Sequence, residues 1–88
     1  MSSATCKLKV GSKESTLDVN TVFKCLRSGE TAALIAELVN KTIPSAGAVP
    51  GSVMWTTDPS YTNGSPVHTN KAKLQQHLNA GGTIYFYI

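Results

Sequence analysis

Apolar and polar residues alternate with period two near the start of the chain, which is the pattern of a β-strand with one face in a core. At the N-terminal end the apolar positions are Cys6, Leu8 and Val10, and the alternation resumes over 16–19 after a turn at 11–15. We therefore expect residues 1–19 to form a β-hairpin with a loop of about three to five residues.

Helical spacing follows the hairpin. Asn20 is placed to cap a helix that begins at Thr21, because its side-chain oxygen can accept a hydrogen bond from an amide of the first turn. Gly29 either ends this short helix or kinks it. The stretch 30–41 is rich in Ala and Leu and is predicted to be the main core helix, closed by Pro44.

The second half of the chain is irregular and contains all four prolines. Its first regular piece is a predicted short strand over 52–56, bounded by turn signals. Asn63 and Gly64 form a tight-turn signal, so 57–67 is expected to fold back as an irregular hairpin.

A third helix and a terminal strand complete the predicted order. Thr69 or Asn70 can cap a helix over 71–79, which a glycine pair ends. The segment 83–88 has no breaker and is apolar or aromatic on both sides, as expected of a central strand. We expect this strand to lie beside the first strand, with the main helix across the sheet.

This α+β order, together with the leucine, glycine turn and β-rich strand over 78–86, resembles the ubiquitin-like β-grasp superfamily in topology. The resemblance implies a small mixed sheet with one main helix packed across it (ββα…β…αβ), and the length of the chain predicts one domain over 1–88. Modifiers and sulfur carriers of that family use a flexible C-terminal Gly-Gly. Here Gly81 and Gly82 precede the last strand, so a conjugation role is not implied.

Composition narrows the class of protein. With 88 residues, 41% of them hydrophobic and 15% charged, the chain fits one folded domain with a mostly neutral polar surface. No apolar run reaches the ~18 residues of a membrane span, and the N-terminus lacks the apolar segment of a signal peptide. Cys6 and Cys25 are too few for a disulfide framework and are expected to be reduced and buried. We therefore expect a cytoplasmic protein that has no contact with a membrane.

Motifs for catalysis or cofactor binding are not found in the sequence. His68 and His77, with the two cysteines, show no metal-ligand spacing such as C-x-x-C or H-x-x-x-H. The glycines form no phosphate-binding loop, and no nucleophile motif is present. We therefore predict that the protein is not an enzyme and has neither cofactor nor metal.

A net charge of +3 invites a nucleic-acid hypothesis. The candidate basic face consists of Lys7 and Lys9 on the first strand with Lys71 and Lys73 on the third helix. Dispersed lysines argue against it, since lysines on a strand commonly prevent edge-to-edge aggregation. Nucleic acid is therefore a disfavoured partner.

The loop after the main helix carries the candidate partner-binding residues Met54, Trp55, Asp58 and Tyr61. Aromatic side chains are enriched where proteins bind one another, although they also fill cores. Because strand residues alternate, Met54 and Trp55 should point to opposite faces.

The preferred hypothesis is a non-enzymatic binding module, such as an adaptor, an inhibitor or a viral accessory protein. It would recognise another protein through the 44–68 loop or a sheet edge. The alternatives are a structural subunit that self-assembles into a homo-oligomer through the C-terminal strand, and a weak nucleic-acid binder.

Overall fold

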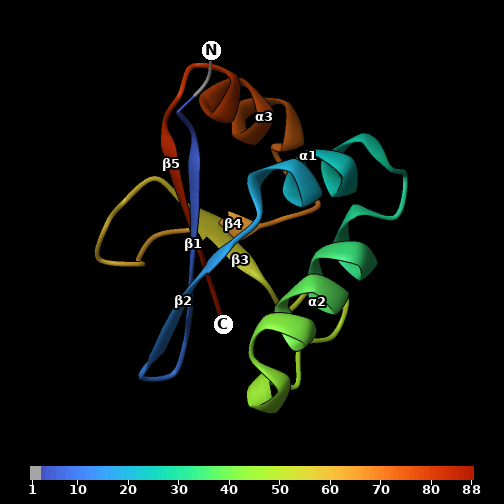
Figure 1. Ribbon diagram of the computed structural model, residues 1–88. Coiled ribbons are helices and arrows are strands. Elements are labelled where there is room, and N and C mark those ends of the chain that lie inside the picture. The colour runs from blue at the N-terminus through green and yellow to red at the C-terminus, as the bar shows by residue number, and fades with distance from the viewer. Residues whose placement is uncertain (1–2) are drawn as a thin grey trace.

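The last strand of the chain, β5 (Thr83–Tyr87), lies inside the sheet in a computed structural model that describes residues 3–88 (Figure 1). β1 (Thr5–Val10) runs parallel to it on one side, and β3 (Met54–Thr56) runs antiparallel on the other. β2 (Lys13–Leu17) and β4 (Ser65–Pro66) complete the order β2-β1-β5-β3-β4. The expected place of the terminal strand, inside the sheet and beside the first strand, is confirmed.

Three α-helices lie on one side of this mixed sheet (Figure 1): α1 (Val19–Arg27), α2 (Thr31–Thr42) and α3 (Lys71–Asn79). A short 3-10 helix over Pro44–Ala46 follows α2. The α+β class is as predicted, and so are the bounds of α3. The expectation of one main helix is too simple, because α1, α2 and α3 all contribute side chains to the core.

α1 begins earlier than the sequence indicated, because its N-cap is Asp18 rather than Asn20. β2 ends at Leu17, which leaves Asp18 in an extended conformation with φ −68° and ψ 119°. Its carboxylate accepts hydrogen bonds from the Thr21 amide at 3.0 Å and the Thr21 hydroxyl at 2.7 Å. These bonds stabilise the charged form and lower the pKa of Asp18. Asn20 is exposed within the first turn of the helix.

The first hairpin also turns more tightly than expected. Val10 pairs with Lys13, so the connection is only Gly11 and Ser12. Gly11 has φ +59°, a left-handed conformation that glycine adopts without steric cost. Residues 13–15, assigned to the turn from composition, therefore belong to β2.

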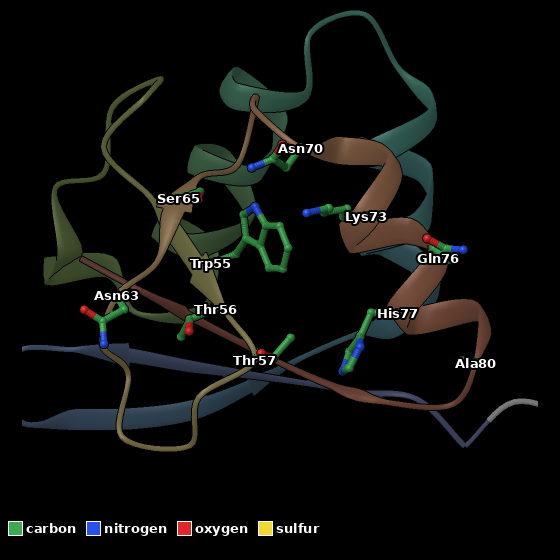
Figure 2. Close-up of a pocket in the computed structure, with 10 residues that line it drawn as sticks. All are labelled: Trp55, Thr56, Thr57, Asn63, Ser65, Asn70, Lys73, Gln76, His77 and Ala80. Carbon is green, nitrogen blue, oxygen red and sulfur yellow. The ribbon is translucent and has the colours of Figure 1, made fainter.

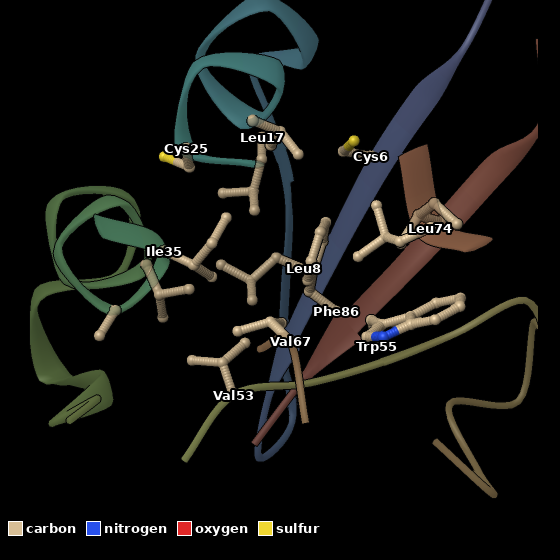
Figure 3. Packing of buried hydrophobic residues seen from close by; sticks show 14 of the residues in the cluster. Cys6, Leu8, Leu17, Cys25, Ile35, Val53, Trp55, Val67, Leu74 and Phe86 are labelled. Carbon is tan, nitrogen blue, oxygen red and sulfur yellow. The ribbon is translucent and has the colours of Figure 1, made fainter. Parts of the chain in front are cut away.

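The core lies between the sheet and the helices (Figure 3). The sheet contributes Cys6, Leu8, Ile84 and Phe86, all fully buried. The helices contribute, among others, Val22, Ile35, Val39, Leu74 and Leu78, which are also fully buried. Val10, expected to point inward, is only half-buried at the end of β1.

Both cysteines are free and buried, as predicted. Burial in apolar surroundings raises the pKa of Cys6 to about 12, with a smaller contribution from the charge of Asp18. The pKa of Cys25 is also raised, chiefly by burial. Both side chains therefore behave as small apolar groups of the core.

No helix within residues 3–88 is long and apolar enough to span a membrane.

Replacing Leu8 by alanine should remove a large part of the stability, because its side chain is fully buried between sheet and helices. We expect a loss of about 2–5 kcal/mol in the free energy of unfolding, from a total of about 4–13 kcal/mol for a chain of this size. Urea denaturation followed by circular dichroism measures this loss. The control Lys7→Ala, at the neighbouring exposed position, should change the free energy by less than about 0.5 kcal/mol.

Candidate functional site

The face of the sheet that points away from the helices is rich in aromatic residues. Along β5, Ile84 and Phe86 enter the core, so Tyr85 and Tyr87 point to the opposite face. Tyr87 is paired with Lys9 on one side and Met54 on the other, which places all three side chains in one row across this outer face.

The loop between β3 and β4 brings a third tyrosine onto this face. The ring of Tyr61 meets Tyr85 edge-on, with centroids 5.3 Å apart, and meets Tyr87 in the same manner at 6.5 Å. The Lys9 ammonium lies 5.5 Å from the centroid of Tyr61, and the Tyr61 hydroxyl donates to Glu14 at 3.4 Å. We call this cluster the tyrosine patch; its members are Met54, Tyr61, Tyr85 and Tyr87, bordered by Lys9 and Glu14.

Asp58 organises the loop that carries Tyr61. Its carboxylate accepts from the Ser60 amide at 2.9 Å, the Ser60 hydroxyl at 2.6 Å and the Thr62 hydroxyl at 3.1 Å. These bonds favour the charged form and lower the pKa of Asp58. The buried Thr56 hydroxyl donates to the carbonyl of Thr62 at 2.9 Å and accepts from the amide of Asp58 at 3.0 Å.

This network holds Tyr61 in an unfavourable backbone conformation. Tyr61 has φ +57°, in the left-handed region that costs a residue with a side chain about 1–2 kcal/mol. Residues held in such conformations cluster at binding and catalytic sites. The hydrogen bonds of Asp58 and Thr56 and the contacts among the rings offset this cost and fix the direction of the Tyr61 ring.

Gly64 anchors the other end of the loop. Its amide donates to the hydroxyl of Tyr87 at 2.9 Å. A Cβ at this position would lie 2.6 Å from both the Trp55 carbonyl oxygen and the Tyr87 hydroxyl, closer than van der Waals contact allows. The close approach of loop and sheet therefore requires glycine here.

The four candidate partner-binding residues are divided between two faces. Met54 and Tyr61 belong to the tyrosine patch, and Asp58 holds the loop beside them. Trp55 points to the opposite face, as strand alternation predicts; it is 8% exposed and its indole N–H donates to the Thr69 carbonyl at 3.4 Å. Trp55 is thus mainly a core residue.

The four lysines of the candidate basic face do not share one surface. Lys7 and Lys9 alternate with the buried Cys6 and Leu8, so they lie on the outer face. Lys71 and Lys73 are on α3, which packs against the other face of the sheet. The Lys71 ammonium is also engaged locally, since it donates to the Thr31 hydroxyl at 3.2 Å and the Ser28 carbonyl at 3.4 Å.

A pocket of about 520 Å³ lies between α3 and the β3–β4 hairpin (Figure 2). It was not anticipated from the sequence, which offers no motif at these positions. The shared direction of Tyr85 and Tyr87 on β5, in contrast, can be predicted from the sequence, because residues two positions apart in a strand point to the same face. The ten lining residues are Trp55, Thr56, Thr57, Asn63, Ser65, Asn70, Lys73, Gln76, His77 and Ala80.

The described residues, 3–88, contain no group of three or more His, Cys, Asp or Glu side chains that could hold a metal ion. His68 is exposed, whereas His77 is half-buried at the pocket. The described residues thus form two distinct surface features, the tyrosine patch and the pocket. Comparison of the chain with protein-family models, curated proteins and solved structures finds no match.

The order of the loop should depend on the charge of Asp58. Because its pKa is below the ordinary 3.8, its hydrogen bonds should be fully present above about pH 4 and lost as the pH falls through the lowered pKa. Asp58→Asn should loosen the loop already at pH 7, since an amide has one acceptor oxygen. NMR shifts of 57–64 and the Tyr61 ring, measured from pH 7 to 2, test this prediction.

Asp18→Asn is the matched control for this titration, because Asp18 caps α1 and makes no contact with the loop. It should leave the loop shifts and their pH response unchanged. Loop shifts of Asp58→Asn that coincide with the wild type at pH 7 would contradict the role assigned to the carboxylate.

Gly64→Ala should be more damaging than Tyr87→Phe. The phenylalanine removes only the hydroxyl that accepts from Gly64, at a cost of about 0.5–1.5 kcal/mol. The alanine Cβ must displace Tyr87 or the backbone of β3, at a cost of about 1–3 kcal/mol. Urea denaturation gives both losses, and equal stability of Gly64→Ala and wild type would show that the loop does not pack as described.

Proposed function

We propose that the protein is a non-enzymatic binding module that docks on a partner protein through the tyrosine patch. The observation that carries the proposal is the contact of Tyr61 with Tyr85 and Tyr87 on the outer face. Two tyrosines of β5 and one from the loop between β3 and β4 gather there, and a hydrogen-bonded loop holds Tyr61 in a costly conformation.

The chemistry of the patch suits a protein partner. Tyrosine offers a large, rigid apolar ring with a polar tip, which explains its enrichment in the centres of protein interfaces. All three rings are half-buried, so each is ordered by its neighbours and still presents area to a partner. Lys9 and Glu14 place opposite charges at the border, where they can set the orientation of docking.

The β-grasp resemblance is part of this proposal. A terminal strand parallel to the first strand, with helices across one face of a mixed sheet, supports it. Such a sheet leaves its outer face uncovered by helices, with only the loop that carries Tyr61 packed on it. Two free cysteines in the core are compatible with a reducing compartment such as the cytoplasm.

The alternative functions receive less support. Self-assembly by pairing of the C-terminal strand needs a free edge, and β5 is bordered by β1 and β3. The outer strands are β2 and β4, and β4 contains Pro66, which cannot donate a hydrogen bond. A nucleic-acid site receives little support because the candidate lysines are divided between two faces of the sheet.

Affinity capture from the source organism, with identification by mass spectrometry, tests the proposal. Tyr61→Ala removes the ring, and the matched control Tyr61→Phe keeps the ring and loses only the hydroxyl that reaches Glu14. We expect a partner protein retained by wild type and Tyr61→Phe, and bound about 30-fold more weakly by Tyr61→Ala, as for a residue at the centre of an interface.

Thermal unfolding of the three proteins confirms that each is folded before capture. Equal retention of the partner by wild type and Tyr61→Ala would contradict a site on the patch. Recovery of the chain alone, as an oligomer in light scattering, would favour self-assembly instead.

A further inference from the structure

The pocket between α3 and the β3–β4 hairpin lies apart from the tyrosine patch. It opens on the side of β3 to which Trp55 points, whereas the patch lies on the side of Met54. Its volume of about 520 Å³ falls in the range of about 300–1,000 Å³ that is usual for small-molecule sites.

One lysine and several hydrogen-bonding side chains line the pocket. Lys73 and His77 project from α3 toward β3 in Figure 2, Asn70 precedes the helix as its N-cap, and the side chain of Gln76 is directed away from Trp55. Within residues 3–88 these four side chains have no hydrogen-bond or ion-pair partner, and Asn70 makes no capping bond. None of the ten lining residues is acidic. A negatively charged ligand would therefore meet one ammonium and several donors without a competing carboxylate.

The imidazole of His77 occupies a space that is open because residue 82 is glycine. Its imidazole lies against the backbone of Gly82, where a Cβ would come within 2.6 Å of the ring carbon Cδ2. Glycine at this position thus lets the ring reach the pocket. The amide of Gly82 also donates to the carbonyl of His77 at 3.0 Å, which fixes the end of α3 to the start of β5.

The wall opposite α3 is the indole of Trp55, which is fixed by the core and by its bond to the Thr69 carbonyl (Figure 2). A rigid aromatic surface facing a flexible cation is suited to a ligand with an apolar ring and a charged group. Hydroxyls of Thr57 and Ser65 lie at the hairpin side and can bind polar substituents.

We propose that this pocket binds a small organic anion, with its carboxylate or phosphate against Lys73 and His77 and its apolar ring against Trp55. The site does not depend on the tyrosine patch, and it requires no chemical step. The ammonium of Lys73 supplies the charge selectivity, because Lys73 is the one lysine or arginine among the lining residues.

Matched pairs of probes test the charge requirement. Benzoate and its neutral isostere benzamide test a carboxylate, and adenosine 5′-monophosphate and adenosine test a phosphate. Trp55 is the single tryptophan of the chain and lines the pocket, so its fluorescence and its indole N–H resonance can be followed without signals from other tryptophans. We expect saturable binding of at least one anion in the micromolar to millimolar range, about tenfold tighter than its neutral analogue.

Variants at Lys73 test the residue assigned to the charge. Lys73→Gln should weaken the anion about tenfold and leave the neutral analogue unaffected, whereas Lys73→Arg should keep the binding. The matched control is Lys24→Gln, an exposed lysine on α1 that does not line the pocket. Both positions are exposed, so the variants should fold, and circular dichroism verifies this.

Three results would overturn the proposal. They are no saturable change at Trp55 with either anion up to about 20 mM, equal affinity for charged and neutral probes, and equal affinity in Lys73→Gln and wild type. Binding of a single-stranded oligonucleotide in place of both small anions would also exclude a small-molecule site. Tyr61→Ala should bind the anion as the wild type does, which separates this test from that of the tyrosine patch.

Discussion

Placing β5 between β1 and β3 determines where the side chains of the sheet must go. Its parallel pairing with β1 and antiparallel pairing with β3 bury Ile84 and Phe86 under the helices. The same pairing turns Tyr85 and Tyr87 outward. A one-residue shift of register would exchange these two sets and move aromatic hydroxyls into the core. The core, the tyrosine patch and the surface on which Tyr61 packs therefore depend on one set of strand pairings.

Hydrogen bonds of polar side chains hold the loop 57–64 in place on the outer face of the sheet. Asp58 and Thr56 bind its backbone and hydroxyls, and Gly64 lets it approach the sheet. A loop held on a rigid sheet in this way has little conformational freedom left to lose. The energy that holds Tyr61 in its left-handed conformation is thus supplied by the fold itself.

The short strand β3 contributes to both the tyrosine patch and the pocket. Its alternation sends Met54 to the tyrosine patch and Trp55 to the core and the pocket. The pocket also contains polar side chains of α3. Their sequence positions do not indicate a pocket, because Lys73 and His77 look like solvated residues on an exposed helix face. They become part of a site only when the hairpin packs opposite α3.

Local sequence patterns and composition determined much of this protein: the alternation of the first strand, the unbroken β-forming run of the last strand, the bounds of α3, the burial of the cysteines and the opposite directions of Met54 and Trp55. Sequence patterns misplaced the α1 cap and the first turn, because several residues near Asp18 and Gly11 suit such positions and the strand pairing chooses among them. Only the tertiary structure joined Tyr61 to Tyr85 and Tyr87, separated Lys7 and Lys9 from α3, and formed the pocket. The reason is physical: hydrogen bonding within a strand or helix repeats over a few residues, whereas contacts between distant segments depend on strand order and register, which no short stretch encodes.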